Sequence, residues 1–94
     1  MSENTHPKPQ KNVVLYTTRF CPYCMKAKRL LDHKGVTYTN IDAVKESALF
    51  KEIMNQTGWD TVPQIFIGDQ FIGGCDDIHR LEEEGKLDQM LWEV

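Results

Sequence analysis

Apolar and polar positions follow two different periods along the first half of the chain. Val13 to Tyr16 is an unbroken apolar run of β-forming residues, which predicts a strand buried on both faces. From Pro22 to Lys34 the apolar residues recur at helical spacing, and the basic residues, Lys34 included, fall on the water-facing side. Gly35 is expected to end this helix. Val36 to Ile41 then alternates and predicts a second strand.

The second half of the chain continues in the same way. Glu46 to Gln56 predicts a second helix, with Leu49 and Ile53 facing inward. Two apolar runs on either side of a Gly-Asp pair predict a β-hairpin over residues 64–72. A strand, a helix, a strand, a helix and a hairpin therefore follow one another.

A third helix is expected after the hairpin, capped by Asp76 or Asp77 and ended by Gly85. Residues 87–91 add a last short turn. The first two strands, joined through a helix, should be parallel with a right-handed crossover, while the hairpin adds an antiparallel edge. This order is similar to the thioredoxin-like arrangement, an α/β fold with a central four-stranded mixed sheet flanked by helices.

Composition narrows the possible classes of protein. The chain has 94 residues, a formal charge of −3 and 40% apolar residues, which suits one compact domain. Charges of both signs are mixed without a basic stripe, so nucleic acid is not an expected partner. No apolar run approaches the ~20 residues of a membrane span, so no membrane partner is expected. Residues 1–11 are polar with two prolines, which predicts a flexible N-terminal tail, a domain over residues 12–94 and a cytoplasmic location.

The cysteines indicate redox chemistry or metal binding. There are three, an odd number, and two of them form the pair Cys21-x-x-Cys24. Pro22 fits the first position of a helix, so Cys21 is expected at its N-cap, where free amides and the helix dipole favour a thiolate. One alternative is a zinc site that Cys75 and His79 would complete, and another is a structural disulfide.

Three blocks of sequence together resemble the glutaredoxin family. They are Cys21-Pro22-Tyr23-Cys24, Thr61-Val62-Pro63-Gln64-Ile65-Phe66-Ile67 and Gly73-Gly74-Cys75-Asp76-Asp77. Their order and spacing are similar to those of small bacterial dithiol members. The resemblance implies a glutathione-dependent thiol–disulfide oxidoreductase without a metal, monomeric, that reduces protein disulfides and protein–glutathione mixed disulfides. Cys21 would be the nucleophile and Cys24 the resolving thiol.

The resemblance also implies where glutathione binds. The expected residues are Arg19, Tyr23, Thr61, Val62, Pro63, Gly74, Cys75 and Asp76. The family has a cis bond before the proline that matches Pro63, so the Val62 backbone would pair with the cysteine of glutathione. On local evidence alone, Pro63 would only begin an edge strand. The amides of Cys75 and Asp76 would hold the γ-glutamyl carboxylate, or the aspartates would simply cap a helix.

Two positions depart from the family pattern. Many relatives have a basic residue where Thr18 stands, and many have Arg just before the Thr-Val-Pro block, where Trp59 and Asp60 stand here. Those positions usually help to hold the glycine carboxylate of glutathione. Arg19 and Lys51 are the candidates that remain for this role.

Two other functions are compatible with the same motifs. One is a redoxin that thioredoxin reductase reduces, although its relatives lack a full glutathione site. The other is a module that binds an iron–sulfur cluster between two chains through Cys21. Pro22 stiffens the loop and Cys24 competes for the same sulfur, which disfavours the cluster.

Overall fold

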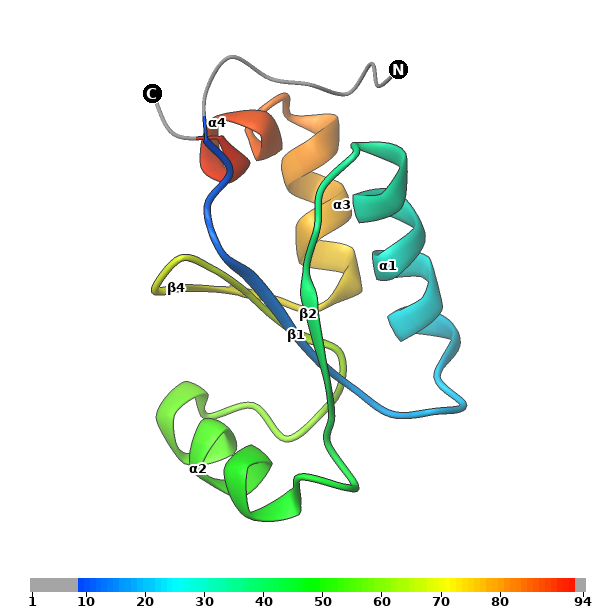
Figure 1. The fold of residues 1–94 in the computed structure, drawn as a ribbon, viewed down its shortest axis with the longest axis vertical. Coiled ribbons are helices and arrows are strands. Elements are labelled where there is room, and N and C mark those ends of the chain that lie inside the picture. Colours follow the sequence, from blue (N-terminus) through cyan, green and yellow to red (C-terminus); the bar gives the residue numbers. More distant parts are fainter. Residues whose placement is uncertain (1–8, 93–94) are drawn as a thin grey trace.

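The computed structural model describes residues 9–92, and Figure 1 shows their arrangement. Four strands and four helices follow the predicted order, with the last short turn forming a fourth helix. Their bounds are β1 Val13–Thr17, α1 Pro22–His33, β2 Thr39–Asp42, α2 Ser47–Thr57, β3 Gln64–Ile67, β4 Gln70–Gly73, α3 Cys75–Glu83 and α4 Leu87–Leu91. Among the described residues, none of the helices has the length and apolar character that a membrane crossing requires.

The strands form one mixed sheet in the order β2-β1-β3-β4. β1 runs parallel to β2 and antiparallel to β3, and β3 and β4 form the predicted hairpin. Leu15 lies opposite Asn40 of β2 on one side and Ile65 of β3 on the other. Because β1 and β3 are the central strands, they are apolar along most of their length, as the sequence predicts.

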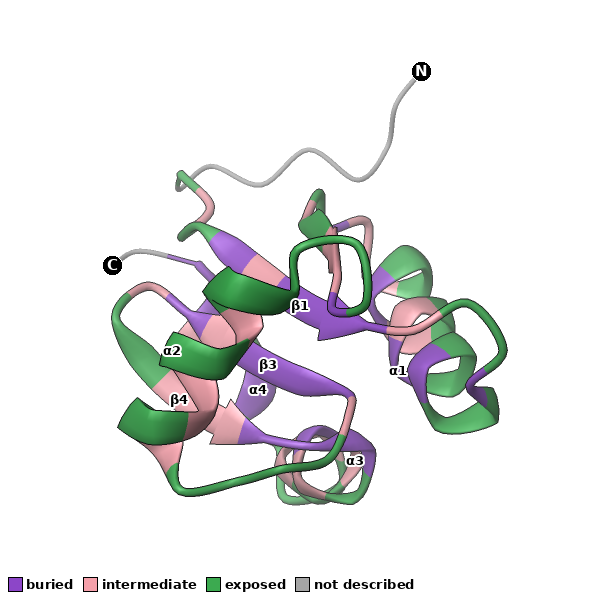
Figure 2. Ribbon diagram, turned by 90° about the horizontal axis from the view of Figure 1, so that it is seen from below, coloured by how far each residue is buried: buried purple, intermediate pink, exposed green. Residues whose placement is uncertain are grey.

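The main core lies between the sheet and the helices α1, α3 and α4. Figure 2 shows buried residues concentrated on β1, β3 and the sides of α1 and α3 that face them. Alternate β1 residues such as Val13 and Leu15 point into this core, whereas Tyr16 points to the other face, where α2 lies. The buried core residues are Val13, Leu15, Ala27, Leu31, Val36, Ile65, Ile67, Cys75, Ile78, Leu87, Leu91 and Trp92.

Helix α2 covers its face of the sheet only loosely, and no residue of α2 is buried. The prediction that Leu49 faces inward is wrong, since its side chain is 39% exposed. Phe50 takes that place, because its ring packs on Tyr16 at a centroid distance of 6.1 Å. Phe50 therefore replaces Leu49 on the face of α2 toward the sheet, while Ile53 is partly buried as expected.

Two other expectations need correction. The second strand begins at Thr39, not at Val36, because the Val36 amide still bonds the Leu31 carbonyl at the end of α1. Lys34 does not simply face water. Its Nζ lies 2.7 Å from a Glu82 carboxylate oxygen and 3.1 Å from one of Asp88, and its side chain is only 14% exposed. Lys34 thus links the end of α1 to α3 and α4.

The folded segment begins before residue 12. Gln10 forms an isolated antiparallel bridge with Trp92, and its side-chain amide donates to the Thr37 carbonyl at 2.7 Å and accepts from the Thr37 amide at 2.9 Å. Gln10 and Lys11 are therefore fixed to the domain, unlike the tail predicted for residues 1–11. Residues 1–8 of that tail lie outside the described residues.

Candidate active site

Cys21 is the N-cap residue of α1, as the sequence predicts. The loop after β1 turns there, and Pro22 begins the helix because its missing N–H leaves no hydrogen bond unmade at that position. The Cys24 amide donates a hydrogen bond to Cys21 Sγ at 3.1 Å. A thiolate at this sulfur is stabilised by that amide and by the positive end of the helix dipole.

Cys24 lies deeper than Cys21, with exposed fractions of 1% and 8%. Burial, together with the hydrogen bond to Cys21, raises the pKa of the Cys24 thiol to about 12, against a smaller lowering by the Thr18 backbone and the charge of Lys28. All three cysteines are free thiols. The environments of the pair therefore differ: Cys21 caps the start of α1 and is slightly exposed, whereas Cys24 is almost fully buried and its thiol is protonated at neutral pH.

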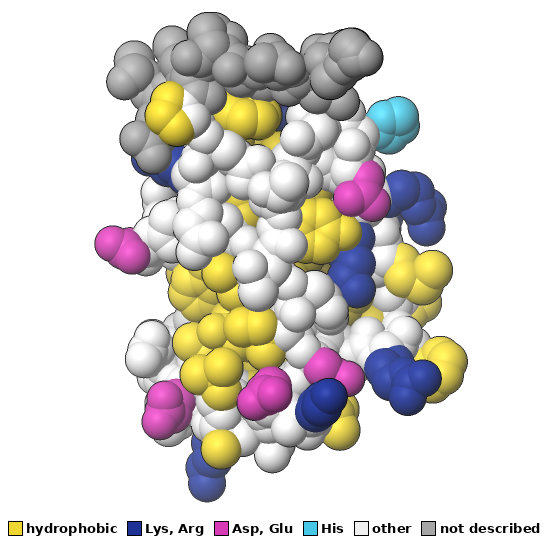
Figure 3. Space-filling view, in the orientation of Figure 1, with side chains coloured by type: hydrophobic (Ala, Val, Ile, Leu, Met, Phe, Trp, Pro, Cys, Tyr) yellow, Lys and Arg dark blue, Asp and Glu magenta, His cyan; other side chains and the backbone are white. Residues whose placement is uncertain are grey.

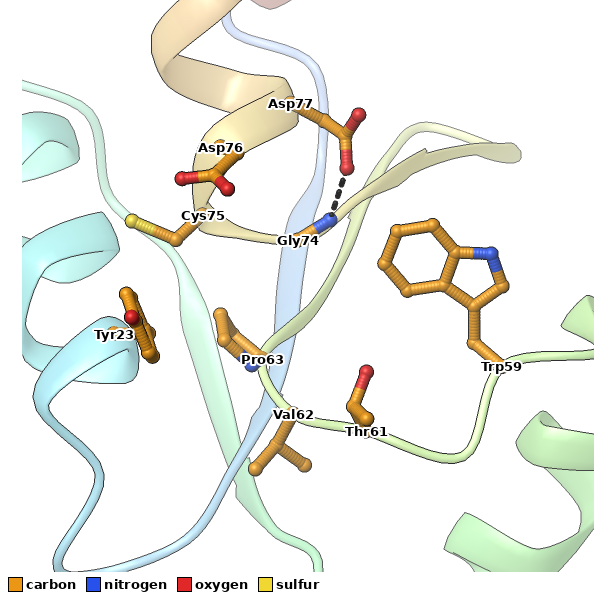
Figure 4. Close-up of a pocket in the computed structure, with 9 residues that line it drawn as sticks. All are labelled: Tyr23, Trp59, Thr61, Val62, Pro63, Gly74, Cys75, Asp76 and Asp77. Carbon is orange, nitrogen blue, oxygen red and sulfur yellow. Dashed lines mark hydrogen bonds between the residues drawn. The ribbon is translucent and has the colours of Figure 1, made fainter.

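A pocket of about 180 Å³ opens beside this pair, and Figure 4 shows the side chains around it. Tyr23 of α1, the loop before β3 and the start of α3 form its walls. The Val62–Pro63 bond is cis, which confirms the expectation drawn from the family resemblance. The lining residues are Tyr23, Trp59, Thr61, Val62, Pro63, Gly74, Cys75, Asp76 and Asp77.

The start of α3 presents amides and carboxylates to this pocket. Gly74 is the N-cap residue, so the prediction of Asp76 or Asp77 at the N-cap position is wrong. Asp77 still stabilises the helix start, because its Oδ2 accepts from the Gly74 amide at 2.9 Å (Figure 4). Asp76 is exposed and lines the pocket. Burial raises the pKa of the neighbouring Cys75 thiol, so Cys75 is a thiol at neutral pH.

Trp59 forms the wall opposite Tyr23. Its ring meets the ring of Phe71 edge to face, with a centroid distance of 5.2 Å. A Cβ placed on Gly74 would lie 3.3 Å from Trp59 Cζ3, so the absence of a side chain at Gly74 permits this close approach. The aromatic ring therefore closes one side of the pocket against the start of α3.

Sequence reasoning missed Gln64, which is completely buried at the start of β3. Its side chain accepts from Thr57 Oγ1 at 3.0 Å and donates to the carbonyls of Trp59 at 2.9 Å and Thr61 at 3.2 Å. Gln64 thus fixes the conformation of the loop before β3, which lines the pocket. A polar amide at the head of an apolar strand was the signal in the sequence.

Seven of the eight residues predicted to contact glutathione line the pocket, and Arg19 does not. Its guanidinium lies 5.9 Å from the Phe20 ring centroid, and its charge acts on Asp42 at the end of β2. Lys51 on α2 is also absent from the pocket walls. Among residues 9–92, no group of three or more His, Cys, Asp or Glu side chains is placed to hold a metal ion.

A reactive dithiol at a helix start, on a sheet of this topology, defines a thiol–disulfide oxidoreductase of the thioredoxin-like fold. The glutaredoxin family model matches residues 13–72. Glutaredoxin of Pseudomonas aeruginosa is 51% identical over 79 residues, which cover 84% of this chain and 94% of that protein. Glutaredoxin 3 of Escherichia coli (strain K12) is 46% identical over 80 residues, 85% of this chain and 96% of that one.

Solved structures of glutaredoxins also match this chain. Glutaredoxin from Brucella melitensis superposes with a TM-score of 0.80 and 46% identity, covering 93% of this chain and 95% of that chain. A buckwheat glutaredoxin–glutathione complex superposes with a TM-score of 0.81 and 36% identity, covering 86% of this chain and 76% of that chain. The chain belongs to the glutaredoxin family. It is a glutathione-dependent thiol–disulfide oxidoreductase.

Proposed function

We propose that Cys21 is the nucleophile toward protein–glutathione mixed disulfides. Its thiolate attacks the glutathione sulfur, the S–S bond breaks, and the protein thiolate leaves and takes a proton. Cys21 then carries glutathione. A second glutathione thiolate attacks the glutathione sulfur, which releases oxidised glutathione and restores the Cys21 thiolate. The observation that carries this proposal is the N-cap position of Cys21, whose sulfur accepts from the Cys24 amide.

With a protein disulfide, the two cysteines act in succession. Cys21 attacks one sulfur and the first protein thiolate leaves. Cys24 loses its proton and attacks Cys21 Sγ, so the second protein thiolate leaves and a Cys21–Cys24 disulfide forms. Two glutathiones then reduce this disulfide. The raised pKa of Cys24 supports this order, because Cys24 stays protonated until the mixed disulfide has formed.

Glutathione would bind in the pocket beside the dithiol. The γ-glutamyl carboxylate would meet the amides of Cys75 and Asp76 at the start of α3, and the Asp76 side chain would accept from the amino group. The Val62 backbone would pair with the cysteine moiety, and Tyr23 would flank the sulfur. The complex of the buckwheat relative with glutathione supports this choice of ligand.

Two substitutions test the roles of the thiols. Cys21→Ser should abolish turnover of a mixed disulfide of glutathione and 2-mercaptoethanol, followed through glutathione reductase and NADPH. Cys24→Ser should retain this turnover and lose reduction of a protein disulfide. Cys75→Ser is the matched control, since it removes a buried thiol of the same pocket without touching the pair. Retained turnover in the Cys21 variant would contradict the assignment.

We also propose that the enzyme works as a monomer in the cytoplasm, on disulfide-containing and glutathionylated proteins. Three free thiols, an odd number, suit a reducing compartment better than a disulfide-stapled fold. Light scattering across a range of concentrations tests the monomer, and cell fractionation tests the location. A stable dimer, or recovery outside the cytoplasm, would contradict these two points.

A further inference from the structure

Exposed apolar side chains lie close to Cys21 in the sequence. Phe20 is 92% exposed, Tyr23 62% and Met25 53%. Two of them, Phe20 and Met25, are absent from the walls of the glutathione pocket. Exposed apolar side chains do not contribute the stabilising free energy that burial would give. A group of them beside a reactive residue therefore indicates an interaction surface.

Basic residues lie among these apolar side chains. From Val13 to Leu31 the sequence has no Asp or Glu, although the whole chain has a formal charge of −3. The basic residues in this segment are Arg19, Lys26, Lys28 and Arg29. Figure 3 shows dark blue and yellow side chains following one another along the right edge, over α1 and the loop before it. The face beside Cys21 is therefore both apolar and basic.

We propose that this face binds the protein substrate, as an extended segment that carries acidic residues beside its disulfide. We call it the α1 docking surface, and all of its residues are exposed. They are Arg19, Phe20, Tyr23, Met25, Lys26 and Arg29. The inference rests on the proposed function, since the bound segment has to bring a disulfide to Cys21.

The charges of this surface are available to a partner. Arg19 lies over the Phe20 ring, so a cation and an aromatic ring are presented side by side. Its acidic neighbour Asp42 already accepts from the amides of Val44 at 2.9 Å and Lys45 at 3.1 Å. Neither Arg29 nor Lys26 forms an ion pair with another residue in the described part of the chain. Complementary charge on a partner would mainly speed its association.

The two substrates would then approach Cys21 from different sides. Two carboxylates, Asp76 and Asp77, line the glutathione pocket, and no basic side chain among the described residues does. An acidic protein segment would therefore find complementary charges on α1 and none among the side chains that line the pocket. Tyr23 belongs to both surfaces and marks the boundary between them. This separation leaves the pocket free for the glutathione that reduces the enzyme afterwards.

Two synthetic peptides test the proposal. Each is closed by one disulfide, and they differ only in having two glutamates or two lysines beside the cysteines. Their reduction is followed with glutathione, glutathione reductase and NADPH. The glutamate peptide should have a kcat/KM about tenfold higher at low salt, and the ratio should fall toward one at about 0.5 M salt, where charges are screened.

Arg29→Glu should reverse this preference, lowering kcat/KM for the glutamate peptide and raising it for the lysine peptide. Phe20→Ala should lower kcat/KM for both peptides. Lys86→Glu is the matched control, because it changes the net charge equally at an exposed site beside α4. All three variants should turn over the mixed disulfide of glutathione and 2-mercaptoethanol at the wild-type rate.

The outcomes separate the two proposals. Equal kcat/KM for the two peptides, or equal effects of Arg29→Glu and Lys86→Glu, would overturn the docking surface while leaving the glutathione chemistry intact. Failure of the wild-type enzyme on the small mixed disulfide would instead overturn the proposed function. A concentration-dependent dimer that Arg29→Glu disrupts would show that a second copy of this chain occupies the surface, which also contradicts the proposal.

Discussion

The buried side chain of Gln64 donates a hydrogen bond from Nε2 to the carbonyl oxygen of Trp59 at 2.9 Å. The same amide group bonds the Thr61 carbonyl and the Thr57 hydroxyl, so one side chain fixes three points of the loop that walls the pocket. The Trp59 amide is held as well, by Thr57 Oγ1 at 3.1 Å. Gln64 is therefore a positioning residue for the pocket, although it does not line it.

Replacing Gln64 with methionine should weaken glutathione binding without slowing the chemical step. The variant leaves the Trp59 and Thr61 carbonyls without this partner, so the loop is no longer held and the free energy of unfolding falls by about 1–3 kcal/mol. We expect KM for glutathione to rise about tenfold while kcat stays near the wild-type value. Gln56→Met, the same change on an exposed helical site, is the control. An unchanged KM for glutathione would show that the loop at Trp59 and Thr61 keeps its conformation without the hydrogen bonds of Gln64.

Alkylation by iodoacetamide should distinguish the two active-site thiols across a wide range of pH. Because the pKa of Cys24 is raised to about 12, its thiolate fraction at pH 8 is only about 10⁻⁴, and Cys21 should be labelled first. Peptide mass spectrometry of the Cys75→Ser variant gives the two rates without interference from the third thiol. Equal alkylation rates for Cys21 and Cys24 at pH 8 would contradict the raised pKa of Cys24.

The same raised pKa makes the protein less stable in alkali. A Cys24 thiol ionises more easily in the unfolded chain than in the folded one. Its contribution to stability is therefore complete below the ordinary thiol pKa and is lost as the pH rises toward about 12. Urea unfolding of the Cys24→Ser variant should show a smaller loss of stability over this interval than the wild type.

Gly73→Ala should destabilise the start of α3. Gly73 has a φ of 120°, and a Cβ there would collide with the Asp77 carboxylate that accepts from the Gly74 amide. We expect the free energy of unfolding to fall by about 2–4 kcal/mol, since strain and a lost cap add together. Gly58→Ala is the matched control, because φ is 77° but nothing lies within 4 Å of its Cβ, and it should cost about 1 kcal/mol. Equal costs would exclude the collision as the cause.

Local chemistry made much of this fold predictable. The hairpin, the helix start at Pro22 and the Cys21 N-cap follow from apolar runs, a Gly-Asp turn and the rules for helix ends, and all three were confirmed. The phase of α2 was not predictable in this way, because its apolar residues spread around the helix and only the contact with Tyr16 decides that Phe50 faces the sheet.

Contacts between distant parts of the chain account for the remaining differences. Lys34 carries the same charge as its exposed neighbours on α1, and only the arrival of Glu82 and Asp88 from α3 and α4 covers it. Although partial burial alone would lower the pKa of Lys34, its hydrogen bonds to these carboxylates raise it. The role of Gln64 likewise depends on where the 57–61 loop folds back, which no local pattern encodes.

The bridge between Gln10 and Trp92 has a practical consequence for engineering. Because of this bridge, the first and last parts of the described domain run side by side and antiparallel. From there, β1 leads the chain away toward Cys21 (Figure 1). A fluorescent reporter fused beyond either end of the described domain would sit away from both the dithiol and the docking surface. The same closeness makes circular permutation of the described domain feasible, with a short linker joining Trp92 to Gln10 and new ends opened in the hairpin turn at Asp69.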